Sequence, residues 1–219
     1  MRNGSRWRDL PHNTIYSIGK SVLISTTDVR TSNSAAMYLA LTSYLANGDN
    51  VVQSDAQVSR VLPTITPLFS EQGYQESSTA GPFEDYVTMG MGKAPLVLVY
   101  EAQFIEYLVE HGPGNPDMVL LYPEPTVFTK HTLVPLSAAG DSLGAALEND
   151  VELQRLAAEY GLRTADASYG DSLWSRKGIH VPTRLIDVID PPSYEVLERM
   201  INTIARGDAP CAQADTTCH

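Results

Sequence analysis

Apolar residues along this chain alternate between short continuous runs and segments in which they recur every three or four positions. In residues 21–41, an apolar run typical of a buried strand leads through a turn of small polar residues into a segment with helical spacing. Residues 94–110 repeat this order, with a continuous apolar run at 96–99. Further strands are predicted at 117–122, 131–136 and 182–188. The alternation of strands and helices predicts an α/β fold.

Helical spacing accounts for much of the remaining chain. Apolar residues in 58–68 fit a helix that Pro63 and Pro67 interrupt or bound. Gly48 stands where a helix C-cap is expected after the first helix. The other expected segments are a helical pattern over most of 140–161, an irregular stretch at 163–180 and a final amphipathic helix at 194–204.

The polar turn within residues 21–41 is the first candidate ligand site. Ser32, Asn33 or Ser34 can each serve as N-cap, since a side-chain oxygen there accepts a hydrogen bond from a backbone N–H two or three residues on. The remaining N–H groups and the positive end of the helix dipole favour a polar or anionic ligand. The alternative is a well-capped helix that binds nothing.

A second candidate site lies where the strand predicted at 96–99 meets its helix. Tyr100, Glu101 and Gln103 stand at this junction, and open α/β sheets bind ligands at such junctions. Glu101 can act there as a general acid or base, but a carboxylate in this position is more often a hydrogen-bonding group or a solvated neighbour. One carboxylate does not establish an enzyme.

The charge and composition narrow the class of partner. The 219 residues include 15 basic and 26 acidic side chains, for a formal net charge of −11. This sign argues against nucleic acid or an anionic membrane as the main partner, although local N–H groups can still bind a small anion. No apolar run approaches the roughly 20 residues that span a bilayer. Residues 1–9 lack the apolar core of a signal peptide, so any export signal has been removed or was never present.

Cysteine and histidine usage gives no sign of a metal or cofactor site. Cys211 and Cys218 are the two cysteines; both lie in a polar tail, where they can pair across a short loop in an oxidising compartment. The five histidines show no metal-ligand spacing. The chain has neither G-x-G-x-x-G nor G-x-x-x-x-G-K-S/T. We therefore expect no metal site and no cofactor.

One motif suggests a hydrolase. Gly140-Asp141-Ser142-Leu143-Gly144 matches the G-x-S-x-G nucleophile elbow, and it is followed by acidic residues (Asp150, Asp166 and Asp171) and then by His180, in the order of a Ser–acid–His triad. However, residues 137–139 separate the motif from the preceding apolar run, whereas an elbow needs the strand to run straight into the turn. A serine hydrolase using Ser142 is therefore kept as an alternative.

Four stretches match a known family in order and spacing: residues 22–41, residues 97–103, residues 121–128 (LYPEPTVF) followed by 133–136, and residues 152–163 (ELQRLAAEYGLR). In these stretches the chain resembles the extracytoplasmic solute-binding proteins of ABC-type importers, of the two-lobed type II class with a mixed sheet in each lobe. The resemblance covers about two thirds of the chain.

The resemblance implies a mixed sheet flanked by helices, as in a periplasmic-binding-protein-like lobe. It places ligand contacts at the helix N-terminus after the first strand of the second lobe, and at a polar residue after a later apolar strand. On this chain, the positions predicted to bind the ligand are Thr27, Thr31, Ser32, Asn33, Ser34, Tyr100, Glu101 and Gln103.

The resemblance also predicts how the chain is divided. The family's first lobe comes mainly from an N-terminal segment, whereas only 20 residues precede Ser21 here. We therefore expect a second lobe without most of the first. Its expected parts are an incoming segment (1–20), a solute-binding lobe (21–163), a return segment with a helix (164–206) and a polar tail (207–219). The ligand crevice is then either open or covered by a homodimer.

We interpret the chain as a solute-binding module of a transport system, periplasmic or extracellular, and not as an enzyme. Its expected partners are a small polar or anionic solute and the membrane components of a transporter. The alternatives are the serine hydrolase and a ligand-sensing or protein-interaction domain, because one fold supports many functions.

Overall fold

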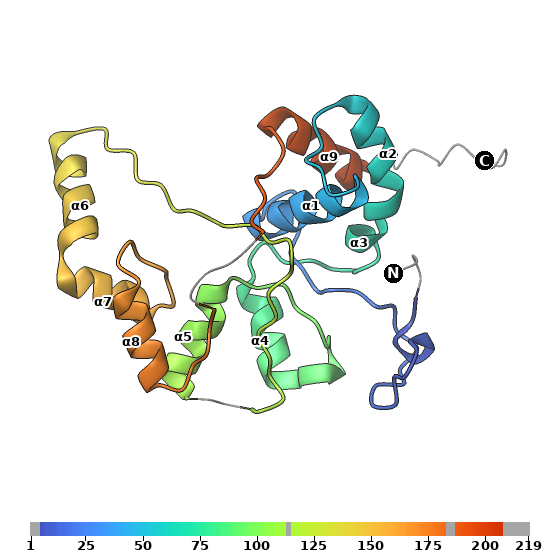
Figure 1. Ribbon diagram of the computed structural model, residues 1–219. Helices are drawn as coiled ribbons and strands as arrows, with labels where there is room; N and C mark the ends of the chain where they lie inside the picture. The colour runs from blue at the N-terminus through green and yellow to red at the C-terminus, as the bar shows by residue number, and fades with distance from the viewer. Residues whose placement is uncertain (1–4, 113–114, 183–186, 208–219) are drawn as a thin grey trace. The chain divides into compact units, whose positions relative to one another are not determined.

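The computed structural model describes residues 5–112, 115–182 and 187–207, and it is built mainly from helices (Figure 1). It is 50% helical and 3% strand, and the described residues form no sheet. The predicted α/β fold with a mixed sheet flanked by helices is therefore wrong. Cys211, Cys218 and the rest of the tail beyond Gly207 lie outside the described residues.

The apolar runs predicted as strands at the start of residues 21–41 and at 96–99 are extended, but they pair with each other at a single position. Ser25 and Val97 form one isolated parallel bridge, in which the Ser25 N–H donates to the Leu96 carbonyl at 2.9 Å and the Leu98 N–H donates to the Ser25 carbonyl at 2.8 Å. Ile24 and Leu98 pack against a helical core. A short apolar run predicts burial but not the partner that buries it, and here helices take the place of neighbouring strands.

Two further strand predictions also fail, and a third lies mostly outside the described residues. Residues 131–136 are exposed and belong to no strand or bridge in the described part of the chain. Residues 117–122 are likewise outside any strand, and the segment predicted at 182–188 is described only at its ends, where Val188 forms a single parallel bridge with Thr126. Single bridges leave most backbone groups of a segment without the ladder that defines a sheet.

The chain divides into two compact units, each described here by itself. The first comprises the described parts of Met1–Leu98 and Ile189–His219, and the second those of Val99–Val188. The chain therefore leaves the first unit after Leu98 and returns to it at Ile189. These limits differ from the boundaries predicted at residues 163 and 206.

The first unit is a helical cluster built on α1 (Asn33–Ala46), α2 (Asp55–Ile65) and α9 (Tyr194–Arg206), which contact one another (Figure 1). It also contains the 3₁₀ turns η1 (Trp7–Asp9) and η2 (Gly90–Gly92) and the helices α3 (Pro67–Ser70) and α4 (Ala80–Met89). Its buried apolar core consists of Val29, Ala35, Tyr38, Leu39, Val52, Val58, Val61, Leu62, Ile65, Phe69, Val196, Met200 and Ile204.

The helices that the sequence predicts in this unit are confirmed. Periodic apolar positions are buried in α2 and α9, whereas α1 is buried on most of its sides. Pro67 begins α3, as predicted, whereas Pro63 lies inside α2 and does not interrupt it. Gly48 follows α1 with a φ of +69°, a left-handed conformation that glycine adopts without a side-chain clash.

The second unit contains α5 (Glu101–His111), α6 (Ala138–Asn149), α7 (Val151–Glu159) and α8 (Ser168–Arg176). Its small core joins Ile105, Trp174 and Ile179, and the Trp174 indole N–H donates to the Ala158 carbonyl at 2.9 Å. The predicted helix at 140–161 is broken in two at Asp150, whose side chain caps α7. The prediction of an irregular stretch at 163–180 missed α8. No helix in the described residues is long and apolar enough to cross a bilayer.

Tyr38 makes the first unit sensitive to high pH. Its ring packs on Phe69 with 5.5 Å between ring centroids, and burial raises the pKa of Tyr38 to about 12. Because the folded-state pKa exceeds the unfolded value of about 10, the neutral phenol supports folding below pH 10, and this contribution is lost as the pH rises from about 10 to about 12. We expect the free energy of unfolding to fall over this window, and to fall less in Tyr38→Phe when both are measured by urea titration. Equal slopes in the two proteins would contradict this.

Candidate functional site

Three hydroxyl groups meet at the N-terminus of α1. The Thr27 Oγ1 donates to Ser32 Oγ at 2.7 Å, lies 2.8 Å from Ser34 Oγ, and the two serine oxygens are 3.0 Å apart. Thr27 is 0% exposed and Ser34 is 4% exposed. We call Thr27, Ser32 and Ser34 the hydroxyl cluster.

The loop that carries the hydroxyl cluster is held from two sides. Within the loop, the backbone N–H groups of Thr31 and Ser32 donate to the Asp28 carbonyl. From outside it, the Asp28 N–H donates to the Glu76 carbonyl at 2.8 Å, and the Gln75 side chain donates to the Thr27 carbonyl at 3.3 Å. These bonds fix the turn between the extended segment and α1.

The one acidic side chain of this loop is already paired. The Arg30 guanidinium and backbone N–H both donate to the Asp28 carboxylate, and these hydrogen bonds lower the pKa of Asp28. The pair therefore offsets a negative charge close to the helix N-terminus. An anion approaching α1 meets a neutral ion pair there, not a bare carboxylate.

The helix itself is left without a side-chain cap. Ser32 is the N-cap residue, but its hydroxyl makes no capping hydrogen bond and turns instead to Thr27 and Ser34. The backbone N–H groups of Ser34 and Ala35 find no acceptor among the described residues, although both residues are buried. The first N–H groups of a helix have no acceptor within the helix, and because Ala35 is 0% exposed, a ligand reaches these two only if the turn before α1 moves.

The second candidate site is occupied by protein groups. The Arg163 Nε donates to Glu101 Oε2 at 2.6 Å, the Arg163 Nη2 donates to Glu101 Oε1 at 2.7 Å, and the Tyr122 hydroxyl donates to the same Oε1 at 2.6 Å. The Arg163 Nη2 also donates to the Pro182 carbonyl. We call Glu101, Arg163 and Tyr122 the Glu101 cluster.

The contacts of the cluster favour a charged Arg163 guanidinium and a neutral Tyr122 phenol. The hydrogen bond to Glu101 raises the pKa of Arg163, and burial together with the bond to Glu101 raises the pKa of Tyr122. A carboxylate that accepts three hydrogen bonds, two of them from one guanidinium, is a poor general base. The cluster ties the start of α5 to the segments around residues 122, 163 and 182.

The predicted ligand residues thus fall into two groups, one in each unit. Thr27, Ser32 and Ser34 come together, whereas Thr31 and Asn33 flank them with exposed side chains. Tyr100, Glu101 and Gln103 lie at the start of α5 in the second unit, where the Tyr100 N–H donates to Gln103 Oε1 at 3.3 Å. Ligand binding by these eight residues remains a prediction.

Sequence reasoning missed the partners that complete both groups. Arg163 lies 62 positions after Glu101, and Gln75 lies 48 positions after Thr27. No spacing rule links residues so far apart in sequence. Only the hydroxyls of the turn had a local signal, namely their position before a helix.

The G-x-S-x-G motif does not form a nucleophile elbow. Ser142 lies inside α6, where its hydroxyl donates to the Ala138 carbonyl at 3.0 Å. An elbow places the serine on a sharp strand-to-helix turn, whereas the glycines of this motif are helical residues. The hydrolase alternative therefore lacks its geometry.

No group of three or more histidine, cysteine, aspartate or glutamate residues in the described parts of the chain is placed to hold a metal ion. No protein-family model, curated protein or solved structure matches the sequence or the structure. Any proposal of a function therefore rests on the local geometry of the chain.

Proposed function

We propose that the protein is a solute-binding module of a transport system, which holds a small polar or anionic ligand at the N-terminus of α1. The observation that carries this proposal is the buried hydroxyl cluster beside the unpaired N–H groups of Ser34 and Ala35. The N–H groups and the helix dipole supply positive potential without a cationic side chain.

The hydroxyl cluster suits a ligand that carries oxygen atoms. A serine or threonine hydroxyl serves as donor or acceptor, so Ser32 and Ser34 can hydrogen-bond to either kind of group on a ligand. Two N–H groups and two hydroxyls can together satisfy the oxygens of a carboxylate, a phosphate or a sugar. The Asp28–Arg30 pair keeps the carboxylate nearest to this site neutralised.

The resemblance of the sequence to the solute-binding proteins of ABC-type importers also supports the proposal. Their sheets do not carry over to this chain. The export of the module to a periplasmic or extracellular location, and its delivery of solute to membrane components, belong to the same proposal.

A thermal-shift screen across oxyanions, amino acids, sugars and metal ions tests the proposal, since a ligand that binds only the folded state raises its Tm. Calorimetry with the ligand found should then show weaker binding by Ser32→Ala and Ser34→Ala. A lost hydrogen bond to a charged ligand costs about 1.5–3 kcal/mol, roughly a tenfold to hundredfold loss of affinity.

Ser43→Ala provides a matched control. Ser43 is a buried hydroxyl of the same helix that donates to the Ala40 carbonyl at 2.9 Å, far along α1 from its N-terminus. We expect this variant to lose some stability but to keep its affinity. Equal affinity in all three variants and the unchanged protein would show that the hydroxyl cluster only shapes the start of α1.

A further inference from the structure

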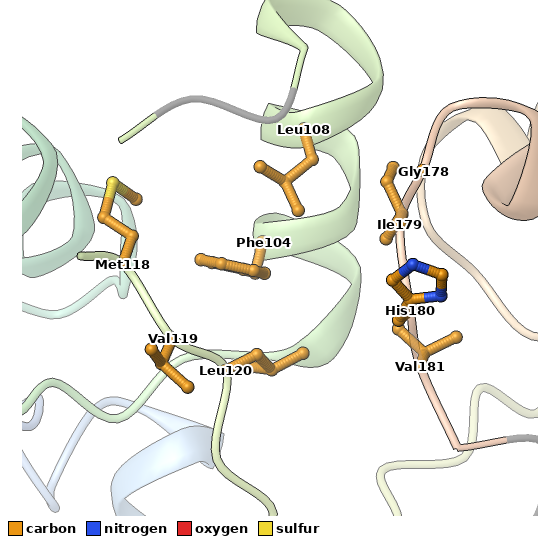
Figure 2. Close-up of a pocket in the computed structure, with 9 residues that line it drawn as sticks. All are labelled: Phe104, Leu108, Met118, Val119, Leu120, Gly178, Ile179, His180 and Val181. Carbon is orange, nitrogen blue, oxygen red and sulfur yellow. The ribbon is translucent and has the colours of Figure 1, made fainter. Parts of the chain in front are cut away.

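A cavity of about 230 Å³ opens beside α5 in the second unit. Figure 2 shows Phe104 and Leu108 projecting from α5 between two extended segments, with Met118 and Val119 on one side and His180 on the other. Apart from His180 and Gly178, the side chains that line it are apolar. The cavity is open to solvent on one side and backbone groups add polar surface to it, so it suits a largely apolar molecule that carries a polar atom.

The size of the cavity limits what it can hold. An engineered, enclosed apolar cavity of about 150 Å³ binds benzene, whereas pockets for drug-sized molecules start at about 300 Å³. The 230 Å³ here falls between these limits. One or two fused aromatic rings fit this range.

The walls favour an aromatic ligand over an aliphatic one. The Met118 thioether makes favourable contacts with aromatic rings, and Phe104 adds aromatic surface to the wall. Val119 is 62% exposed although it lines the cavity, so an apolar side chain stands at the mouth in contact with water. A bound ring would cover it.

We propose that this cavity is a binding site for a small aromatic molecule of one or two rings. The imidazole of His180, the one lining side chain with hydrogen-bonding groups, supplies a donor or an acceptor to a polar atom on the ring system. The site lies wholly within the second unit and does not rest on the ligand site at α1.

Indole is a suitable probe, because it has two fused rings and one N–H group. In protein labelled with ¹³C-methyl methionine, the Met118 methyl signal, assigned through Met118→Leu, should shift on titration with indole and reach saturation. Val119→Asp places a charge at the mouth without disturbing a buried position, and we expect it to weaken indole binding at least tenfold.

Val134→Asp is the matched control, since Val134 is a 71% exposed valine of the same unit that does not line the cavity. It should bind indole with unchanged affinity, as should Ser34→Ala, which alters only the other proposed site. A Met118 signal that does not saturate, or equal weakening by Val119→Asp and Val134→Asp, would overturn the proposal. The polar role of His180 requires His180→Leu to lower the affinity for indole more than that for 1-methylindole, and equal losses would overturn it.

Discussion

Arg163→Met should lower the free energy of unfolding of the second unit by about 2–3 kcal/mol. The substitution leaves the Glu101 carboxylate, whose side chain is 20% exposed, without its guanidinium partner. Hydrogen bonds to charged groups contribute about 1.5–3 kcal/mol, and a mostly buried charge that loses its partner costs more than an exposed one. Urea unfolding followed by Trp174 fluorescence, in a Trp7→Phe background, measures the change in this unit.

The Arg155–Glu152 pair gives the control for Arg163→Met. These two side chains form an exposed ion pair on α7 in the same unit, at 3.1 Å. Exposed pairs contribute little, so Arg155→Met should change the free energy of unfolding by no more than about 0.5 kcal/mol. Adding Glu101→Gln to Arg163→Met should recover part of the loss, because the uncompensated charge is removed. Equal effects of Arg163→Met and Arg155→Met would show that the Glu101 cluster is not a stabilising contact.

Met200→Ala should destabilise the first unit by about 2–5 kcal/mol, the range for truncating a buried methionine to alanine. Met200 is 0% exposed in the core that α9 shares with α1 and α2. The loss comes from apolar contacts and from the cavity left behind. Hydrogen exchange of the α1 and α2 amides, read by mass spectrometry, should therefore accelerate by about 30-fold or more.

Met89→Ala removes the same side chain from α4, where it is 49% exposed. This control should leave the exchange of α1 and α2 nearly unchanged, since half of the side chain already contacts water. If Met200→Ala left these amides as protected as Met89→Ala does, α9 would not be part of the core. The comparison therefore tests directly whether the chain returns to its first unit after residue 188.

The positions of several helices could be read from the sequence. Apolar spacing placed α2, α5 and α9, because a helix that buries one face must repeat its apolar residues about every 3.6 positions. The end of α1 at Gly48 was also predictable, since the left-handed conformation there depends on one residue.

The absence of a sheet from the described residues could not be predicted in the same way. The run at residues 96–99 is apolar whether strands or helices cover it, and in this protein Leu98 packs on a helical core. The Ser142 motif failed for a related reason, because its five residues fit the first half of α6 as well as a strand-to-helix turn. A short pattern specifies which residues are present, but not which helices or strands surround them in the fold.

The sequence by itself determined where several of the helices form and that a polar turn precedes α1, because hydrogen bonds and apolar spacing within a helix join residues at most a few positions apart. Only the tertiary structure decided that helices replace the sheet, that Thr27, Ser32 and Ser34 bond to one another instead of capping α1, and that Arg163 and Tyr122 occupy Glu101. These contacts join residues as many as 62 positions apart. Their formation depends on how whole segments pack, which no local pattern encodes.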